Sequence, residues 1–293
     1  MNVNDLAPPL RIGNREFPGP LVMGIINRTP DSFYPAARQM NDGKALDSAV
    51  KAVDEGADVI DVGGVRAGRG RVIDVGEEIE RVIPFITKLR KKVPQTLISV
   101  DTWRYEVARE AAEAGVDIIN DTWAGADEKV VEVAAEFDLG LVCSHTGGMP
   151  PRTDPFRAYY PQSVVSDVVE TLREAAQRYV DAGVHPRSVL VDPTHDFGKT
   201  TWHSLELLRH TEELVALGYP VLMALSRKDF VGETLGLPVD ERLEGTLAAT
   251  TLAAWKGATI FRAHDVQATK RTLQMVATLR AERQPSRVIR GMG

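Results

Sequence analysis

Apolar runs recur along nearly the whole chain, and each contains or ends on a polar or charged residue. They read VMGIIN at Asn27, ADVIDVG with Asp61, LISVD at Asp101, VDIIND at Asn120 and Asp121, LVCSH at His145, VLVD at Asp192, VLMALSRK with Ser226 and Lys228, and ATIFRAH with Arg262 and His264. Buried parallel strands read as continuous apolar runs, and strands that alternate with helices indicate βαβ units. The pattern predicts an α/β protein with the (β/α)8 TIM-barrel architecture, in which all these polar residues meet at one end.

The stretches between these runs predict helices, and most of the helices are followed by a glycine. The expected helices span 44–55, 76–92, 104–114, 127–137, 164–182, 205–216, 242–256 and 266–283. Glycines at positions 56, 115, 183, 218 and 257 stand where a left-handed cap is expected. This repeated order of helix, glycine and strand favours one alternating domain.

The composition is that of a soluble globular protein, with 43% hydrophobic and 26% charged residues in 293. We expect an irregular lead-in over 1–20, the barrel over 21–284 and a basic tail over 285–293. The net charge of −6 argues against nucleic acid or an anionic membrane as a partner. The single cysteine, Cys143, permits no intrachain disulfide, and no signal pattern or membrane-spanning run occurs, so we expect a cytoplasmic location.

Three strand-to-helix connections are unusually long and lie at the end of the barrel that carries the polar residues. They span 29–43, 63–75 and 146–162. Long loops at this end of a barrel usually carry function or close over a ligand, although they can also be plain surface decoration. We expect the first two loops to border the ligand site.

One group of strand ends suits a flat heterocycle. Asp101, Asn120 and Asp192 follow three different strands, and carboxylates with an amide can accept from ring N–H groups and donate to a carbonyl. Each of the two aspartates can instead cap the helix that follows it. Their shared position at the ends of successive strands favours a ligand.

A second group suits an anion. Arg262 and His264 end the last strand and Asn27 ends the first, and these strands are neighbours if the barrel closes. A guanidinium and an imidazole suit phosphate or pyrophosphate, and an amide oxygen can help to hold hydrated Mg²⁺. The alternative is that Arg262 pairs with an acid such as Asp265 and that His264 only packs. Lys228 stands between the two groups.

These residues make the chain resemble the dihydropteroate synthase family. The motifs MGIINRTPDSF, DVIDVGG, ISVDT, IINDT, LVDPTHDFGK, LSRK and FRAHD occur in the family's order from about Leu21 to the last helix. The resemblance implies a homodimeric, Mg²⁺-dependent barrel that joins 6-hydroxymethyl-7,8-dihydropterin pyrophosphate to p-aminobenzoate. Pyrophosphate leaves early in that reaction, and the aniline nitrogen attacks the pterin cation.

The resemblance also implies roles for individual residues. Asp101, Asn120, Asp192, Lys228 and Phe197 correspond to the pterin site. Arg262, His264 and Asn27 correspond to the pyrophosphate group, with Asn27 at the metal and with Lys228, Arg262 and His264 as the catalytic residues. Ser226 corresponds to the serine near p-aminobenzoate.

The two closing loops depart from the family pattern. TPDSFSDGG is replaced by TPDSFYPAA, so Pro35, Ala36 and Ala37 remove an acid and two hinge glycines. GGESTRPG is replaced by GGVRAGRG, which removes the Ser-Thr-Arg-Pro group of the p-aminobenzoate pocket. Either Arg66, Arg69 and Arg71 supply the missing guanidinium or they face solvent, so binding of p-aminobenzoate, sulfonamides or sulfones is in question.

The pterin side changes as well. His195 and Asp196 stand where an aromatic and a small residue are usual, and Thr146 stands where methionine is common. Added polar bulk is expected to narrow or recharge the pterin pocket. The chain therefore resembles the second, loop-divergent synthase copy that some bacteria carry.

We arrive at one leading hypothesis and three alternatives. The leading hypothesis is a synthase homologue that keeps the pterin and pyrophosphate pocket and has weak or no activity. The alternatives are a working synthase that uses Arg66 or Arg69 in a new geometry, a non-catalytic regulator whose ligand tunes a partner protein, and a methyltetrahydrofolate methyltransferase on the same barrel. The Arg262–His264 pair and the SRK motif disfavour the last.

Overall fold

The computed structural model describes residues 7–28, 42–68, 70–152 and 159–290. Eight parallel strands form one sheet in the order β8-β7-β6-β5-β4-β3-β10-β9. They are β3 (Leu21–Asn27), β4 (Val59–Gly63), β5 (Leu97–Asp101), β6 (Ile118–Asn120), β7 (Gly140–Ser144), β8 (Val189–Asp192), β9 (Leu222–Met223) and β10 (Ile260–Ala263). A parallel bridge between Val191 and Val221 joins β8 to β9. The sheet is thereby closed into the predicted (β/α)8 barrel.

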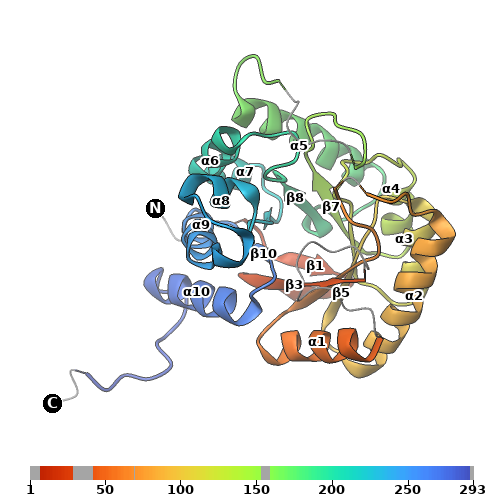
Figure 1. The fold of residues 1–293 in the computed structure, drawn as a ribbon, viewed down its shortest axis with the longest axis horizontal. Helices are drawn as coiled ribbons and strands as arrows, with labels where there is room; N and C mark the ends of the chain where they lie inside the picture. The colour runs from red at the N-terminus through yellow and green to blue at the C-terminus, as the bar shows by residue number, and fades with distance from the viewer. Residues whose placement is uncertain (1–6, 29–41, 69, 153–158, 291–293) are drawn as a thin grey trace.

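Helices surround this barrel as an outer ring (Figure 1). They are α1 (Asp42–Asp54), α2 (Val75–Lys92), α3 (Tyr105–Glu113), α4 (Val130–Glu136), α5 (Val164–Asp181), α6 (Thr201–Arg209), α7 (Thr211–Val215), α8 (Asp229–Leu235), α9 (Leu243–Trp255) and α10 (Val266–Leu279), with short 3₁₀ turns η3 (Pro186–Ser188) and η4 (Val239–Glu241). All five predicted cap glycines have positive φ, from 81° at Gly218 to 106° at Gly257. None of the helices among the described residues is long and apolar enough to cross a membrane.

The sequence had suggested an irregular amino-terminal segment, but part of this segment is regular. Strands β1 (Leu10–Ile12) and β2 (Arg15–Phe17) form an antiparallel hairpin around Gly13, whose φ is +54°. Leu10 and Ile12 are buried against the apolar layer at the amino ends of the barrel strands, which includes Met23 and Leu190. Alternating burial in this short strand was hidden by the prolines around it.

Differences from the expected helices stand out in three places. Helix α6 begins at Thr201, because Thr200 and His203 form a reciprocal capping box, and a break at His210 separates it from α7. Helix α8 was not predicted. Helix α10 ends at Leu279, four residues before Arg283.

Candidate functional site

The polar strand ends meet inside the barrel at its carboxyl end. Asn27, Gly63, Asp101 and Asn120 are register partners across the neighbouring strands β3, β4, β5 and β6, so they lie in one row. The structure therefore places Asn27 in line with Asp101 and Asn120. The heterocycle group and the anion group predicted from sequence are parts of one site.

Arg262 occupies the centre of this site and is held by two carboxylates. Its Nε donates to Oδ2 of Asp61 at 2.7 Å, and its Nη2 donates to Oδ2 of Asp101 at 2.9 Å. Asn120 Nδ2 also donates to Asp61 Oδ2, at 3.2 Å. The alternative pairing with Asp265 does not occur, since Asp265 accepts from Arg227 instead.

Burial governs the protonation of these acids. Loss of hydration raises the pKa of Asp101 to about 7, because Arg262 offsets the burial only in part and the nearby Asp61 adds like charge. Burial also raises the pKa of Asp192, although Lys228 and the Thr194 N–H, which donates to Asp192 Oδ1 at 2.7 Å, act against it. Asp101 caps no helix, whereas Asp192 supports the turn after its strand.

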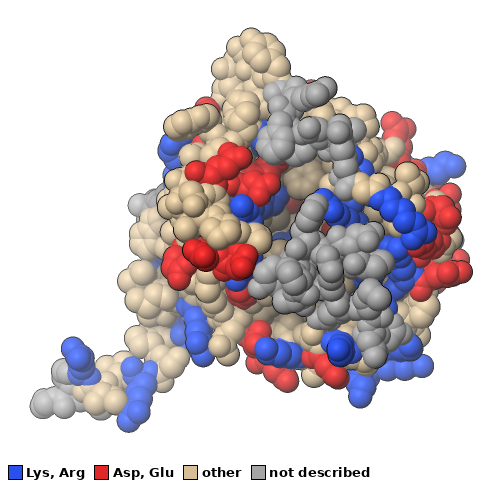
Figure 2. Space-filling model, in the orientation of Figure 1, with Lys and Arg blue, Asp and Glu red and all other residues tan. Residues whose placement is uncertain are grey.

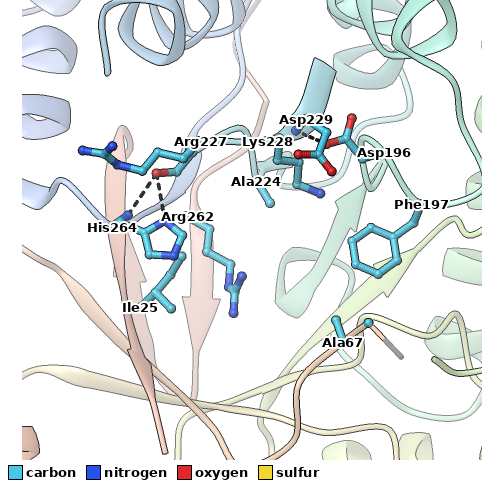
Figure 3. A pocket seen from close by; sticks show the side chains of 12 residues that line it. Ile25, Ala67, Asp196, Phe197, Ala224, Arg227, Lys228, Asp229, Arg262 and His264 are labelled. Atoms are coloured by element: carbon cyan, nitrogen blue, oxygen red, sulfur yellow. Dashed lines mark hydrogen bonds between the residues drawn. The ribbon is translucent and has the colours of Figure 1, made fainter. Parts of the chain in front are cut away.

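A cavity of about 320 Å³ opens beside these residues (Figure 3). Lys228 and Phe197 form one wall, with the Lys228 Nζ 4.7 Å from the centre of the Phe197 ring. Ser226 and His264 form the opposite rim, with Ser226 Oγ 3.1 Å from His264 Nδ1. Arg262 reaches the cavity from β10, so five of the predicted residues line one space.

The second loop presents small residues to this cavity. Ala67 and Gly68 line it, and Arg66 is not among its described lining residues. Arg71 turns away and pairs with Glu77 at 2.6 Å. Arg69 and the first loop lie outside the described residues. Whether one of these arginines replaces the missing guanidinium stays a prediction.

The polar replacements near Lys228 have separate positions. Asp196 lines the cavity, and its carboxylate accepts from the N–H of Asp229 at 2.7 Å and of Phe230 at 3.3 Å at the start of α8. His195 is buried away from the cavity against Phe230, and its carbonyl accepts from Lys228 Nζ. Thr146 belongs to a different cavity. Of these three replacements, only Asp196 changes the charge of the predicted site.

Charges of both signs surround the hollow at this end of the barrel. Figure 2 shows acidic and basic side chains beside each other near the centre of the face turned to the viewer. Asp196 and Asp229 stand beside Lys228 in the cavity wall, and Arg227 points away from it (Figure 3). Burial lowers the pKa of Lys228, with Asp196 and Asp192 acting in the opposite direction.

Asp61 is the functional side chain to which the sequence gave no role. It is fully buried, it contacts Arg262 and Asn120, and it lies two residues before the end of β4. Because both faces of a parallel strand are buried, its apolar run shows no alternation that would mark the inward face. A carboxylate in the middle of an apolar run was the available signal.

This fold and site define a (β/α)8-barrel protein with charged and polar side chains gathered at the carboxyl ends of its strands. Residues 23–264 match the family described as pterin binding enzymes, and the chain belongs to the dihydropteroate synthase family. It is 59% identical over 275 residues to "Inactive dihydropteroate synthase 2" of Mycobacterium leprae, covering 93% of this chain and 94% of that protein.

The chain is also similar to proteins named simply dihydropteroate synthase. The dihydropteroate synthase of Bacillus subtilis is 40% identical over 258 residues, covering 87% of each chain. The solved structure of Xanthomonas albilineans dihydropteroate synthase with 4-aminobenzoic acid superposes with a TM-score of 0.84 at 35% identity, covering 94% of this chain and 99% of that one. The barrel and the family predicted from sequence are confirmed.

Proposed function

We propose that this protein is a dihydropteroate synthase homologue that binds the pterin pyrophosphate and has little or no synthase activity. The observation that carries the proposal is a contrast within one site. The polar strand ends are complete, while the described part of the second loop lines the cavity with Ala67 and Gly68 where a p-aminobenzoate pocket is expected. The similarity to the M. leprae protein named inactive supports the same conclusion.

The strand ends suit a pterin. Asp101, Asn120 and Asp192 present acceptors and an amide that match the N–H and carbonyl edge of the ring. Asp61 holds both Arg262 and Asn120 in place. Lys228 and Phe197 would cover the reactive end of the bound ring.

The leaving group would meet Arg262, His264 and Asn27. Among the described residues, no three His, Cys, Asp or Glu side chains gather as a metal site. The Asn27 amide oxygen fits one position of Mg²⁺, whose remaining positions suit water and pyrophosphate oxygens. When bound, the ion would neutralise charge on the leaving pyrophosphate.

The second half of the reaction lacks support. The carboxylate of p-aminobenzoate needs a cationic partner, and Ala67 and Gly68, which line the cavity from the described part of the second loop, carry no charge. Asp196 and Asp229 lie beside Lys228 and offset part of its positive charge, so they weaken its attraction for a second anionic substrate. Binding without turnover is the expected behaviour.

The test measures binding and turnover on the same sample. We expect calorimetry to show binding of 6-hydroxymethyl-7,8-dihydropterin pyrophosphate with Mg²⁺, and no release of pyrophosphate after p-aminobenzoate is added. A matched variant carries Val65→Glu, Arg66→Ser, Ala67→Thr, Gly68→Arg and Arg69→Pro, and should gain p-aminobenzoate binding. Robust turnover by the unaltered protein would overturn the proposal. If that turnover disappeared in Arg66→Ala or Arg69→Ala, it would establish the working-synthase alternative.

We also propose that the protein is a cytoplasmic homodimer. The single thiol, Cys143, is free and buried, which suits a reducing compartment. Large apolar side chains are exposed on successive carboxyl-terminal elements, with Trp255 41% and Leu279 60% accessible, and a second copy would cover such a surface.

A further inference from the structure

A second cavity of about 560 Å³ lies next to the pterin site and shares no lining residue with it. Its walls come from the segments that follow β6 and β7 and from the first turns of α5. Trp123 lines this cavity and Phe197 lines the first one, and their rings meet edge to face with centres 5.3 Å apart. The two spaces are thus separated by one pair of aromatic rings.

The described lining of the second cavity carries one negative charge. Among the described residues that line it, Asp167 is the only charged side chain, and it is 44% exposed. The His145 imidazole adds no positive charge, because burial and the nearby Lys199 lower its pKa to about 4. Its Nε2–H donates to Asp167 Oδ1 at 2.8 Å, which leaves Nδ1 as a buried acceptor without a partner among the described residues.

Lys199 does not neutralise this space. Its ammonium is buried behind the wall and donates to the carbonyls of His145 at 2.7 Å and of Phe197 at 2.9 Å. Burial lowers its pKa to about 7, so part of its charge is lost at neutral pH. It is not among the described residues that line the cavity.

The aromatic walls are fixed in position. Tyr160 donates its hydroxyl to the Gly198 carbonyl at 2.8 Å, and its ring meets His203 edge to face at 5.0 Å. Trp123 is held by Phe197 and is only 4% exposed. Ring faces attract cations, and rings that are already ordered lose little entropy when a ligand arrives.

We propose that this cavity binds a small organic cation of the ammonium or amidinium class. Its positive group lies against Asp167, and its apolar body packs on Trp123 and Tyr160. The proposal does not rest on the activity of the pterin site. The ligand would contact Trp123, which in turn contacts Phe197 in the wall that carries Lys228.

The test uses three probes of one shape: benzamidine, neutral benzamide and anionic benzoate. We expect calorimetry at neutral pH to show that benzamidine binds at least about tenfold more tightly than benzamide, because a charge-assisted pair is added. Asp167→Asn keeps the acceptor for His145 and should remove that preference. Asp181→Asn, near the far end of α5, is the control and should leave it unchanged.

Two results would overturn the proposal. One is equal affinity for benzamidine and benzamide in the unaltered protein, including no binding of either at millimolar concentration. The other is an unchanged preference in Asp167→Asn, which would place the cation elsewhere, for example beside Asp196 and Asp229. Tyr160→Leu gives a second reading, since it should weaken benzamidine binding without altering the charge of the cavity.

Discussion

His145 follows β7, and its buried imidazole makes a single side-chain hydrogen bond, to Asp167 on α5. The sequence showed a polar residue at the end of a strand, which it grouped with the others around the predicted site. In the structure the side chain turns instead toward the second cavity. Residue type and position along a strand were predictable, whereas the direction of the side chain depends on the neighbouring helix. Asp61 was overlooked for the related reason that burial on both faces hides the inward one.

This imidazole makes the stability of the protein depend on pH. Its pKa is about 4 in the folded protein and near 6.5 when unfolded, so between these values the unfolded chain binds more protons. The contribution of this imidazole alone should therefore lower the free energy of unfolding by about 2 kcal/mol as pH drops from 7 to 5. Urea unfolding at both pH values measures the change in the free energy of unfolding. In His145→Gln the part of this change that comes from the imidazole should be missing. His210→Gln, at an exposed helix end, is the control. If His145→Gln lost as much stability between pH 7 and pH 5 as the unaltered protein, the assignment would be contradicted.

Among the elements, the second loop is held from outside by three arginines. Arg81 of α2 donates to the Gly64 carbonyl at 2.9 Å, and Arg104 before α3 donates to the Ile73 carbonyl at 2.6 Å. Arg152 of the 146–162 loop donates to the carbonyls of Gly68 at 3.3 Å and Arg71 at 2.8 Å. A loop tied in this way keeps its small residues toward the cavity.

Removal of the link between these two loops should loosen the second one. In Arg152→Ala two hydrogen bonds are lost, each worth about 1 kcal/mol, so amide exchange over residues 64–74 should speed up by roughly tenfold or more. Hydrogen–deuterium exchange with mass spectrometry checks this. Arg173→Ala, on the exposed side of α5, should leave the loop unchanged. Identical protection in Arg152→Ala and the unaltered protein would show that the other contacts hold the loop.

Element boundaries were predictable where a local signal sets them. The five glycines after the helices all have the left-handed conformation that the sequence suggested. Helix α8 was overlooked because its amino end depends on Asp196, which lies 33 residues earlier than Asp229 and accepts from its N–H. The same holds for the β1–β2 hairpin, which gains its stability from burial against the barrel.

At the scale of the whole molecule, the hairpin closes the amino end of the barrel. Leu10 is 1% exposed and packs in the layer formed by the first inward residues of all eight strands. Leu10→Ala should lower the free energy of unfolding by about 2 to 4 kcal/mol, through lost burial and a cavity. Chemical denaturation measures the change. Arg15→Ala, at an exposed position of the same hairpin, should change it by less than about 0.5 kcal/mol; equal effects would mean that the hairpin does not seal the layer.

The sealing layer contains no residue of the loops at the opposite end. An apolar layer that stabilises this barrel and the groups that would carry out its chemistry thus lie at opposite ends of the same strands. Substitutions at the open end can remove one reaction, or prepare another, while the closed end preserves the scaffold. Such a division lets a lineage keep a protein after its original reaction is lost, and gives a duplicated gene room to acquire a new ligand.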